Sequence, residues 1–172
     1  MTDNRFKDHL GRPIVAVTGM GVITSLGQGL ADNWAALTSG KSGIHYINRF
    51  DTEGMSTRIA GTVDFIDIPA PNSVERSYAM ARETTIEALA QAGIAGDFNG
   101  PLFLAAPPVE PEWSDRFALA ERSPPPAHPG DAYDRFLAAM REKADPVFLE
   151  AVQFGSISER LADRFGRRRI FV

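Results

Sequence analysis

The chain has 172 residues and a mass of 18.7 kDa, so one domain is expected, able to bury about two thirds of its unfolded surface. Apolar residues make up 44% and charged residues 23%, which argues against a disordered or collagen-like chain. No apolar run reaches the roughly 18 residues of a membrane span. The net charge of −4 argues against nucleic-acid binding by bulk positive charge. With no cysteine, these residues hold no disulfide, thiolate metal site or cysteine nucleophile.

The chain opens with a predicted strand, loop and helix. Residues 1–12 are polar and mixed in charge, so we expect no secretory leader and a cytoplasmic protein. Residues 14–18 are a β-branched run, typical of a strand buried on both faces. Periodicity predicts a helix over 29–39, and Gly40 supplies its C-terminal stop. One face of this helix carries Leu30, Trp34 and Leu37.

The next elements continue the alternation of strands and helices. Residues 59–63 predict a strand, and residues 73–92 predict the clearest helix, with Ser73 as its cap and Gly93 at its end. A short apolar run over 102–106 predicts another buried strand. The order β, α, β, α, β favours an α/β protein with helices packed on a sheet.

The composition changes after the third predicted strand. Seven of the twelve prolines lie in residues 107–130, which predicts an irregular excursion outside the sheet. Helical patterns resume over 132–143 and 156–165, and residues 170–172 resemble the opening of a strand. A domain rarely stops on the first residues of a buried strand, because their backbone groups need partners. We therefore expect the chain to be the front part of a longer domain.

Two glycine motifs partly match known phosphate-binding and nucleotide-binding motifs. The pair Gly19 and Gly21 suggests a dinucleotide fingerprint, but Thr24 stands where the third glycine belongs and the helix starts too late. We expect these glycines to allow a tight turn or close backbone approach instead, and no cofactor. Residues 40–42 resemble the end of a P-loop, but Ala35 replaces the first glycine of that motif.

The polar candidates are few. The three histidines are far apart in sequence and suggest no metal site; they are His9, His45 and His128. A basic cluster near the C-terminus could meet an acidic partner or complement a helix dipole, and the sequence leaves both open. The cluster consists of Arg164, Arg167, Arg168 and Arg169.

Several short blocks in the first third of the chain resemble one family, the β-ketoacyl-acyl-carrier-protein synthases. The blocks are Val15-Ala16-Val17-Thr18-Gly19-Met20-Gly21-Val22-Ile23, Leu26-Gly27, Trp34, Leu37, Ser39-Gly40-Lys41-Ser42-Gly43-Ile44, Arg49-Phe50-Asp51-Thr52 and Thr57-Arg58-Ile59-Ala60-Gly61. The likeness covers residues 13–63 and continues along 74–93. It implies a thiolase-like αβαβα layered fold, of which residues 1–172 supply about the first half, and a dimeric condensing enzyme of fatty acid or related lipid and polyketide synthesis.

The resemblance also implies partners and site positions. Family members act on acyl carrier protein, and the arginines at 164 and 167–169 are our candidates for docking it, because residues 64–73 carry no lysine or arginine. Val109 falls near the channel-lining turn of the family, so it is a candidate pocket residue, with ordinary loop packing as the alternative. Prolines follow the strand there, where the family has a glycine-rich turn.

The family's catalytic cysteine and two histidines have no counterpart in this chain, and the family's cysteine follows a strand that residues 170–172 begin. We therefore assign no catalytic residue here and expect the complete protein to be an acyltransferase, with these 172 residues inactive alone. The C-terminal half or a second condensing-enzyme subunit would supply the nucleophile. The alternative is a non-catalytic partner that binds a condensing enzyme or the carrier protein.

Overall fold

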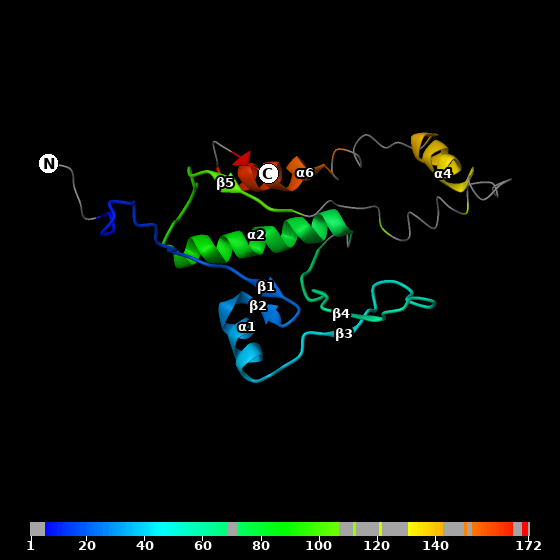
Figure 1. Cartoon of the computed structure of the whole chain (residues 1–172), viewed down its shortest axis with the longest axis horizontal. Coiled ribbons are helices and arrows are strands. Elements are labelled where there is room, and N and C mark those ends of the chain that lie inside the picture. The colour runs from blue at the N-terminus through cyan, green and yellow to red at the C-terminus, as the bar shows by residue number, and fades with distance from the viewer. Residues whose placement is uncertain are drawn as a thin grey trace.

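The structure, a computed structural model, describes residues 6–68, 72–106, 112, 121, 131–142, 150, 153–166 and 170–171. Helices and strands alternate along the chain (Figure 1). The helices are α1 (Gly29–Thr38), α2 (Ser73–Gln91), α4 (Asp131–Glu142) and α6 (Phe154–Phe165). The strands are β1 (Ile23–Thr24), β2 (Gly27–Gln28), β3 (His45–Tyr46), β4 (Ile59–Ala60), β5 (Leu102–Phe103) and β6 (Ile170–Phe171).

The helices confirm the sequence periodicity to within a few residues, and one predicted cap is wrong. Glycines at 40 and 93 adopt positive φ just beyond α1 and α2, as expected of helix stops. The cap of α2 is Asn72 and not Ser73. The extended backbone of Asn72 lets its Oδ1 accept the N–H of Glu75 at 2.8 Å, whereas Ser73 is already helical.

The main apolar core forms where α6 packs on α2. Three residues of α6 at helical spacing are buried, and Leu161 is 1% exposed. Side chains from α2 and from the segment around β5 cover this stripe. The cluster comprises Ile157, Leu161 and Phe165, packed against Tyr78, Ala81, Leu89, Leu102 and Leu104. The pattern predicted for residues 156–165 is therefore a core-facing helix.

An ion pair joins the same two helices near the start of α2. The two terminal guanidinium nitrogens of Arg160, Nη1 and Nη2, donate to the Glu75 carboxylate at 2.8 and 2.9 Å. The Arg160 guanidinium also lies 3.8 Å from the ring centroid of Tyr78, a cation–π contact. This hydrogen bonding lowers the pKa of Glu75 and raises that of Arg160. The bidentate geometry fixes the rotation of α6 on α2.

The end of α6 delivers the chain to a parallel strand pair. Gly166 has a positive φ of 71°, and an added Cβ would meet the side chain of Asp97. The N–H of Phe98 donates to the carbonyl of Phe165 at 2.8 Å. Strand β6 then pairs in parallel with β5, confirming strands at both predicted places. In this pair, Leu102 lies opposite Ile170 and Phe103 lies opposite Phe171.

The strand predicted over residues 14–18 is not formed. This segment runs without a strand partner among the described residues, and Val15 and Val17 are 89% and 79% exposed. A β-branched run becomes a strand only when a neighbour takes its N–H and C=O groups. The described part of the chain contains three separate two-stranded sheets, none of which includes this segment.

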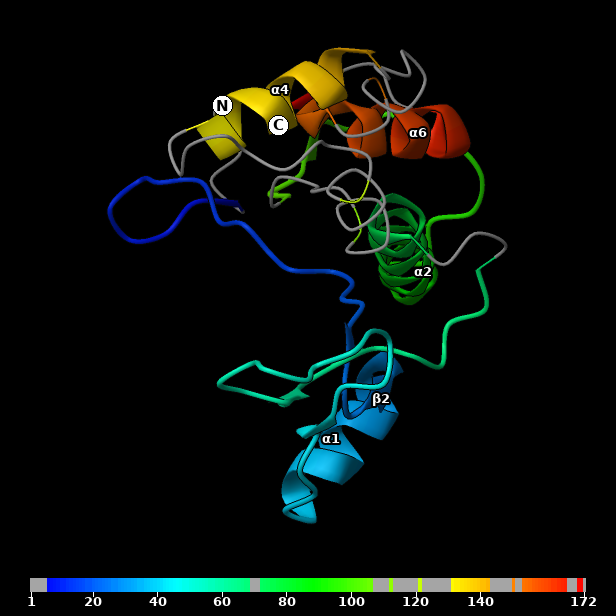
Figure 2. The ribbon, with the colours of Figure 1, turned by 90° about the vertical axis from the view of Figure 1, so that its right-hand side faces the viewer.

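Helix α2 is central in the described architecture. Figures 1 and 2 place α6 and β5 on one side of α2, and α1 with β1 and β2 on the other. Helix α4 lies beyond α6 and makes no substantial packing contact with another described element. Among the described helices, none is both long enough and apolar enough to cross a bilayer.

We predict that Glu75→Gln lowers the free energy of unfolding by about 0.5–1 kcal/mol at neutral pH, because the exposed pair is partly screened by solvent. The pKa of Glu75 is lower in the folded chain than its ordinary value of 4.5. The difference from wild type should therefore be present above that value and vanish as the pH falls through the folded pKa. Urea unfolding at stepped pH measures it. Glu159→Gln, on the exposed face of α6, should change little; a pH-independent difference would contradict the prediction.

Candidate functional site

The glycine segment lies directly on the backbone of α2. An ideal Cβ at Gly19 would collide with the carbonyl oxygen of Ala88, and one at Gly21 would collide with that of Thr84. These two helix residues are four apart and so lie on one face of α2. Because any side chain would separate the two backbones, glycine is required at both positions.

Acceptors on α2 satisfy the backbone of this segment. The Glu87 carboxylate accepts the N–H of Val22 through Oε2 at 2.9 Å and the N–H of Leu30 through Oε1 at 2.8 Å. One turn later, Gln91 Oε1 accepts the N–H of Met20 at 2.6 Å. A carboxylate at the first turn of α1 also complements the helix dipole. Glu87 therefore ties the glycine segment and α1 to α2.

The hairpin between these contacts is closed by a buried polar network. Asn33 is 5% exposed, and its Nδ2 donates to the carbonyls of Gly27 and Gly29 at 2.9 and 2.8 Å. Thr24 Oγ1 donates to Asn33 Oδ1 at 2.5 Å and accepts the N–H of Leu26 at 3.0 Å. These groups satisfy one another, and their hydrogen bonds tie the hairpin to the start of α1.

This geometry excludes the two nucleotide-binding alternatives. Close approach to α2 is confirmed as the role of the first two glycines, and the N–H groups of Met20 and Val22 are already bonded there. Helix α1 begins only at Gly29, too late for a dinucleotide fingerprint. The N–H groups of Gly40 and Lys41 donate to carbonyls of α1 and are unavailable to a phosphate.

The described histidine with polar partners is His45. Its Nε2 lies 2.5 Å from Thr62 Oγ1 and 3.6 Å from Asp64 Oδ2, and the Thr62 hydroxyl donates to Asp64. Both partners face the same ring nitrogen, so this is not a nucleophile–base–orienter arrangement. Within the described ranges, no group of three or more His, Asp or Glu side chains could hold a metal ion.

The predicted site residues are only partly described. Val109 and the arginines at 167–169 lie outside the described residues. Arg164 is an exposed residue in the last turn of α6. The sequence analysis did not single out Glu87 and Gln91. Their spacing of four along a predicted helix does indicate that they lie on the same face of that helix. Nothing in that spacing indicates which backbone groups they bind.

The comparisons with known proteins agree with this architecture. Residues 13–101 match the family described as "Beta-ketoacyl synthase, N-terminal domain". The chain is 35% identical over 94 residues to the 3-oxoacyl-[acyl-carrier-protein] synthase 2 of Coxiella burnetii, covering 51% of this chain and 23% of that protein. It is 36% identical over 105 residues to the tetracenomycin polyketide synthase ketoacyl synthase beta subunit of Streptomyces glaucescens, covering 61% and 24%.

A solved structure titled "The ishigamide ketosynthase/chain length factor" matches with a TM-score of 0.62 and 24% identity, over 91% of this chain and 38% of that chain. The chain therefore has part of the thiolase-like fold, as predicted. Because the family match covers more than half of its residues, the chain belongs to the β-ketoacyl synthase family. It spans about a quarter of the length of the curated relatives that it matches.

We predict that Gly21→Ala lowers the free energy of unfolding by about 1–3 kcal/mol, because the new methyl group overpacks the contact with Thr84. Gly155→Ala is the control: its nearest neighbour atom would be 3.7 Å away, and alanine favours the helix. Urea unfolding of the two variants measures the difference. Equal effects would contradict the close packing of Gly21.

We predict that Glu87→Gln destabilises the chain by about 1–3 kcal/mol, since the amide keeps one acceptor and turns its NH₂ toward a backbone N–H. Hydrogen exchange should accelerate at the amides of Val22 and Leu30. Glu83→Gln, on the same helix but bonded to its neighbour Arg82, is the matched control and should leave both amides protected. Unchanged exchange in Glu87→Gln would show that this carboxylate does not hold the segment.

Proposed function

We propose that the chain forms the N-terminal part of a β-ketoacyl-acyl-carrier-protein synthase of fatty acid or polyketide synthesis. The family match over residues 13–101 is the observation that carries the proposal. The names of the Coxiella and Streptomyces relatives support the two metabolic settings, respectively. The contact of α6 with α2 supports assigning residues 1–172 to the N-terminal part of one ketosynthase domain, because α6 lies beyond the matched range yet packs on α2, which lies within it.

The proposed reaction is a decarboxylative condensation. A cysteine thiolate attacks the carbonyl carbon of an acyl thioester, the carbon–sulfur bond to the carrier breaks, and the carrier leaves as its thiolate. Loss of CO₂ from a malonyl thioester on the carrier protein then yields a carbanion, whose carbon attacks the acyl-enzyme carbonyl. A carbon–carbon bond forms, the enzyme's carbon–sulfur bond breaks, and the thiolate is restored. Hydrogen-bond donors stabilise the developing oxyanion.

These 172 residues contain no cysteine, so we propose that a polypeptide outside them supplies the nucleophile. The contribution of this chain is scaffold: the glycine segment, α1 and α2, which are joined by hydrogen bonds and direct backbone contact, form a unit on which the remaining layers pack. We keep Val109 as a proposed pocket residue. We also keep Arg164 and the arginines at 167–169 as the proposed docking site for the acidic carrier protein; the exposure of Arg164 supports this role. We place the reaction in the cytoplasm, which keeps thiols reduced.

The second candidate function is a non-catalytic subunit paired with a condensing enzyme. The cysteine-free composition supports it, as do the names of two similar proteins, a "ketoacyl synthase beta subunit" and a "ketosynthase/chain length factor". The two candidates differ in one respect: whether the nucleophile belongs to the same polypeptide or to a separate one.

We predict that the isolated 172-residue polypeptide forms no β-ketoacyl product from acyl and malonyl thioesters of the carrier protein, because it lacks a thiolate. Mass spectrometry of the carrier-bound products measures this, and product above a boiled-protein control would contradict it. Denaturing intact-mass analysis of the protein from its native source distinguishes the candidates. A cysteine-containing mass above 18.7 kDa supports the synthase; an 18.7 kDa species that copurifies with a condensing enzyme supports the subunit. An 18.7 kDa species that copurifies with no condensing enzyme contradicts both candidate functions.

A further inference from the structure

The sequence contains a single Asn–Gly pair, Asn99–Gly100, in the loop between α2 and β5. Asn99 is exposed, and its side-chain amide forms no hydrogen bond with a described residue. The backbone N–H of Gly100 also forms no hydrogen bond with a described residue. A backbone nitrogen that no acceptor holds therefore lies next to the carbonyl carbon of an unbound side-chain amide.

The missing side chain of Gly100 favours a reaction between these two groups. A nucleophile that is held beside its target reacts far faster than the same group on a separate molecule. Gly100 has no Cβ to obstruct the approach of its nitrogen to the Asn99 side chain. The local packing also requires glycine there, because an added Cβ would collide with the ring of Phe98. The residue type that permits the reaction is thus the one that the fold needs.

Two other asparagines are held by hydrogen bonds that prevent the same reaction. Asn72 Oδ1 accepts the N–H of Glu75 at 2.8 Å, which fixes the side chain as the cap of α2. The next backbone nitrogen, that of Ser73, donates to the Glu112 carboxylate. Asn33 is buried in α1, where its side-chain amide donates two hydrogen bonds to backbone carbonyls. Asn99 has neither kind of restraint.

We propose that Asn99 is a site of spontaneous deamidation. The nitrogen of Gly100 loses its proton and attacks Cγ of Asn99, so that a carbon–nitrogen bond forms. The bond from Cγ to Nδ2 breaks, and the leaving nitrogen takes up a proton and departs as ammonia. The product is a succinimide ring, and its formation needs no enzyme. This inference goes beyond the proposed function and does not depend on condensing activity.

Water then opens the succinimide ring at one of two carbonyl carbons. Opening at Cγ gives aspartate at position 99 with the original main chain. Opening at the backbone carbonyl carbon gives isoaspartate, in which the main chain runs through Cβ and Cγ and so gains one carbon atom. Both products carry a new negative charge, but only isoaspartate changes the length of the main chain.

The extra carbon atom would enter a segment that is held at both ends. On one side, the N–H of Phe98 donates to the carbonyl of Phe165 at 2.8 Å. On the other side, β5 pairs with β6, and Leu102 lies opposite Ile170. Pro101 has a restricted φ, so the short connection has little freedom to absorb a longer main chain. Isoaspartate therefore displaces β5 from its contacts with β6 and α6.

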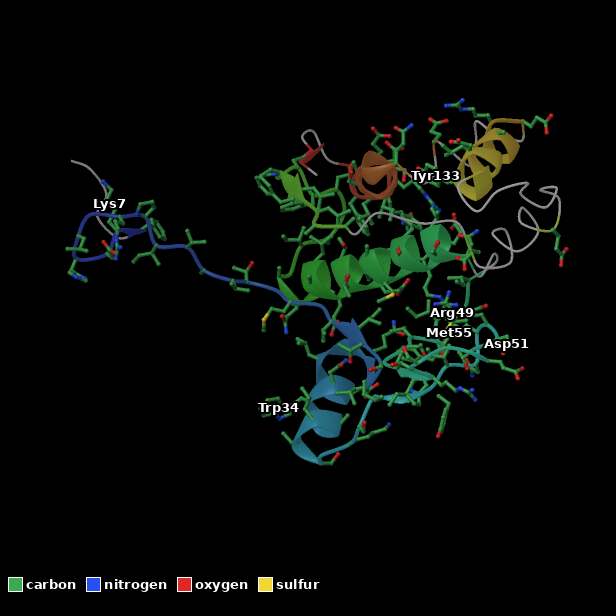
Figure 3. The ribbon with its side chains drawn as sticks, turned by 45° about the vertical axis from the view of Figure 1, so that its right-hand side comes forward. Lys7, Trp34, Arg49, Asp51, Met55 and Tyr133 are labelled. Atoms are coloured by element: carbon green, nitrogen blue, oxygen red, sulfur yellow. The ribbon has the colours of Figure 1, made fainter. Side chains whose placement is uncertain are left out.

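Displacement of β5 would also disturb the apolar core. Leu102 and Leu104, in and just after β5, pack against the buried side chains of α6. Figure 3 shows side chains filling the space between α2, α6 and β5. Close-packed interiors transmit small shifts, so a displaced strand loosens this packing. We therefore expect isoaspartate, and not aspartate, to weaken the contact of β5 with α6.

Peptide mapping by mass spectrometry of the 172-residue chain, incubated at mildly alkaline pH, measures the modification. Selective methylation by a protein isoaspartate methyltransferase distinguishes isoaspartate from aspartate. Conversion at Asn99 should be at least several-fold faster than at Asn72, and it should accelerate with pH because the attacking nitrogen must lose its proton. Asn99→Gln is the matched control. It keeps the amide but requires a larger ring, so it should stay unmodified.

Hydrogen exchange measures the structural consequence. Chain that has been aged until it is rich in isoaspartate should exchange several-fold faster at the amides of β5 than fresh chain. Asn99→Asp carries the same added charge on an unchanged main chain, so its β5 amides should exchange like those of fresh wild type. Equal acceleration in Asn99→Asp would contradict a main-chain effect.

Three results would overturn the proposal. The first is an Asn99 that stays intact in the folded chain, with chain unfolded in urea as the positive control for the chemistry. The second is conversion of Asn72 as fast as that of Asn99 in the folded chain, which would show that the hydrogen bonds do not select the site. The third is unchanged exchange of the β5 amides in chain that is rich in isoaspartate.

Discussion

Direct backbone contact between the glycine segment and α2 is the constraint on which the rest of the structure depends. Gly19 and Gly21 bring their segment against backbone carbonyls of α2. The Glu87 carboxylate of α2 accepts hydrogen bonds from the N–H groups of Val22 and Leu30 beside that contact. Since Glu87 also binds the first turn of α1, one side chain fixes three segments relative to one another. A side chain in place of either glycine would separate the backbones and lengthen these hydrogen bonds.

The opposite side of α2 is held by different forces. There the contact is mainly apolar, centred on Leu161, with the Glu75–Arg160 pair setting the rotation of α6. Burial of apolar side chains supplies most of the stabilisation. The solvent-exposed ion pair contributes little free energy, and its main effect is to orient α6 on α2. Helix α2 thus joins two regions that do not otherwise pack extensively on each other.

The described residues leave apolar surface uncovered, and this surface bears on the function of the chain. Val15, Val17, Trp34 and Leu37 are apolar side chains that a self-contained domain would bury, yet they are exposed. The chain spans about a quarter of the length of its curated relatives, which supports the proposal that it acts together with other polypeptide segments. In the proposed synthase, polypeptide segments outside these 172 residues would cover that surface.

The sequence by itself determined the helices, because 3.6-residue periodicity and glycine stops are local properties. It also determined the family, through short blocks around Gly19 and Ser39. Only the tertiary structure decided which groups satisfy the glycine segment, that Asn72 caps α2, and that Arg160 pairs with Glu75 from 85 positions away. The run over 14–18 shows the reason. Strand propensity is local, but a strand exists only where a distant segment supplies its hydrogen-bond partners.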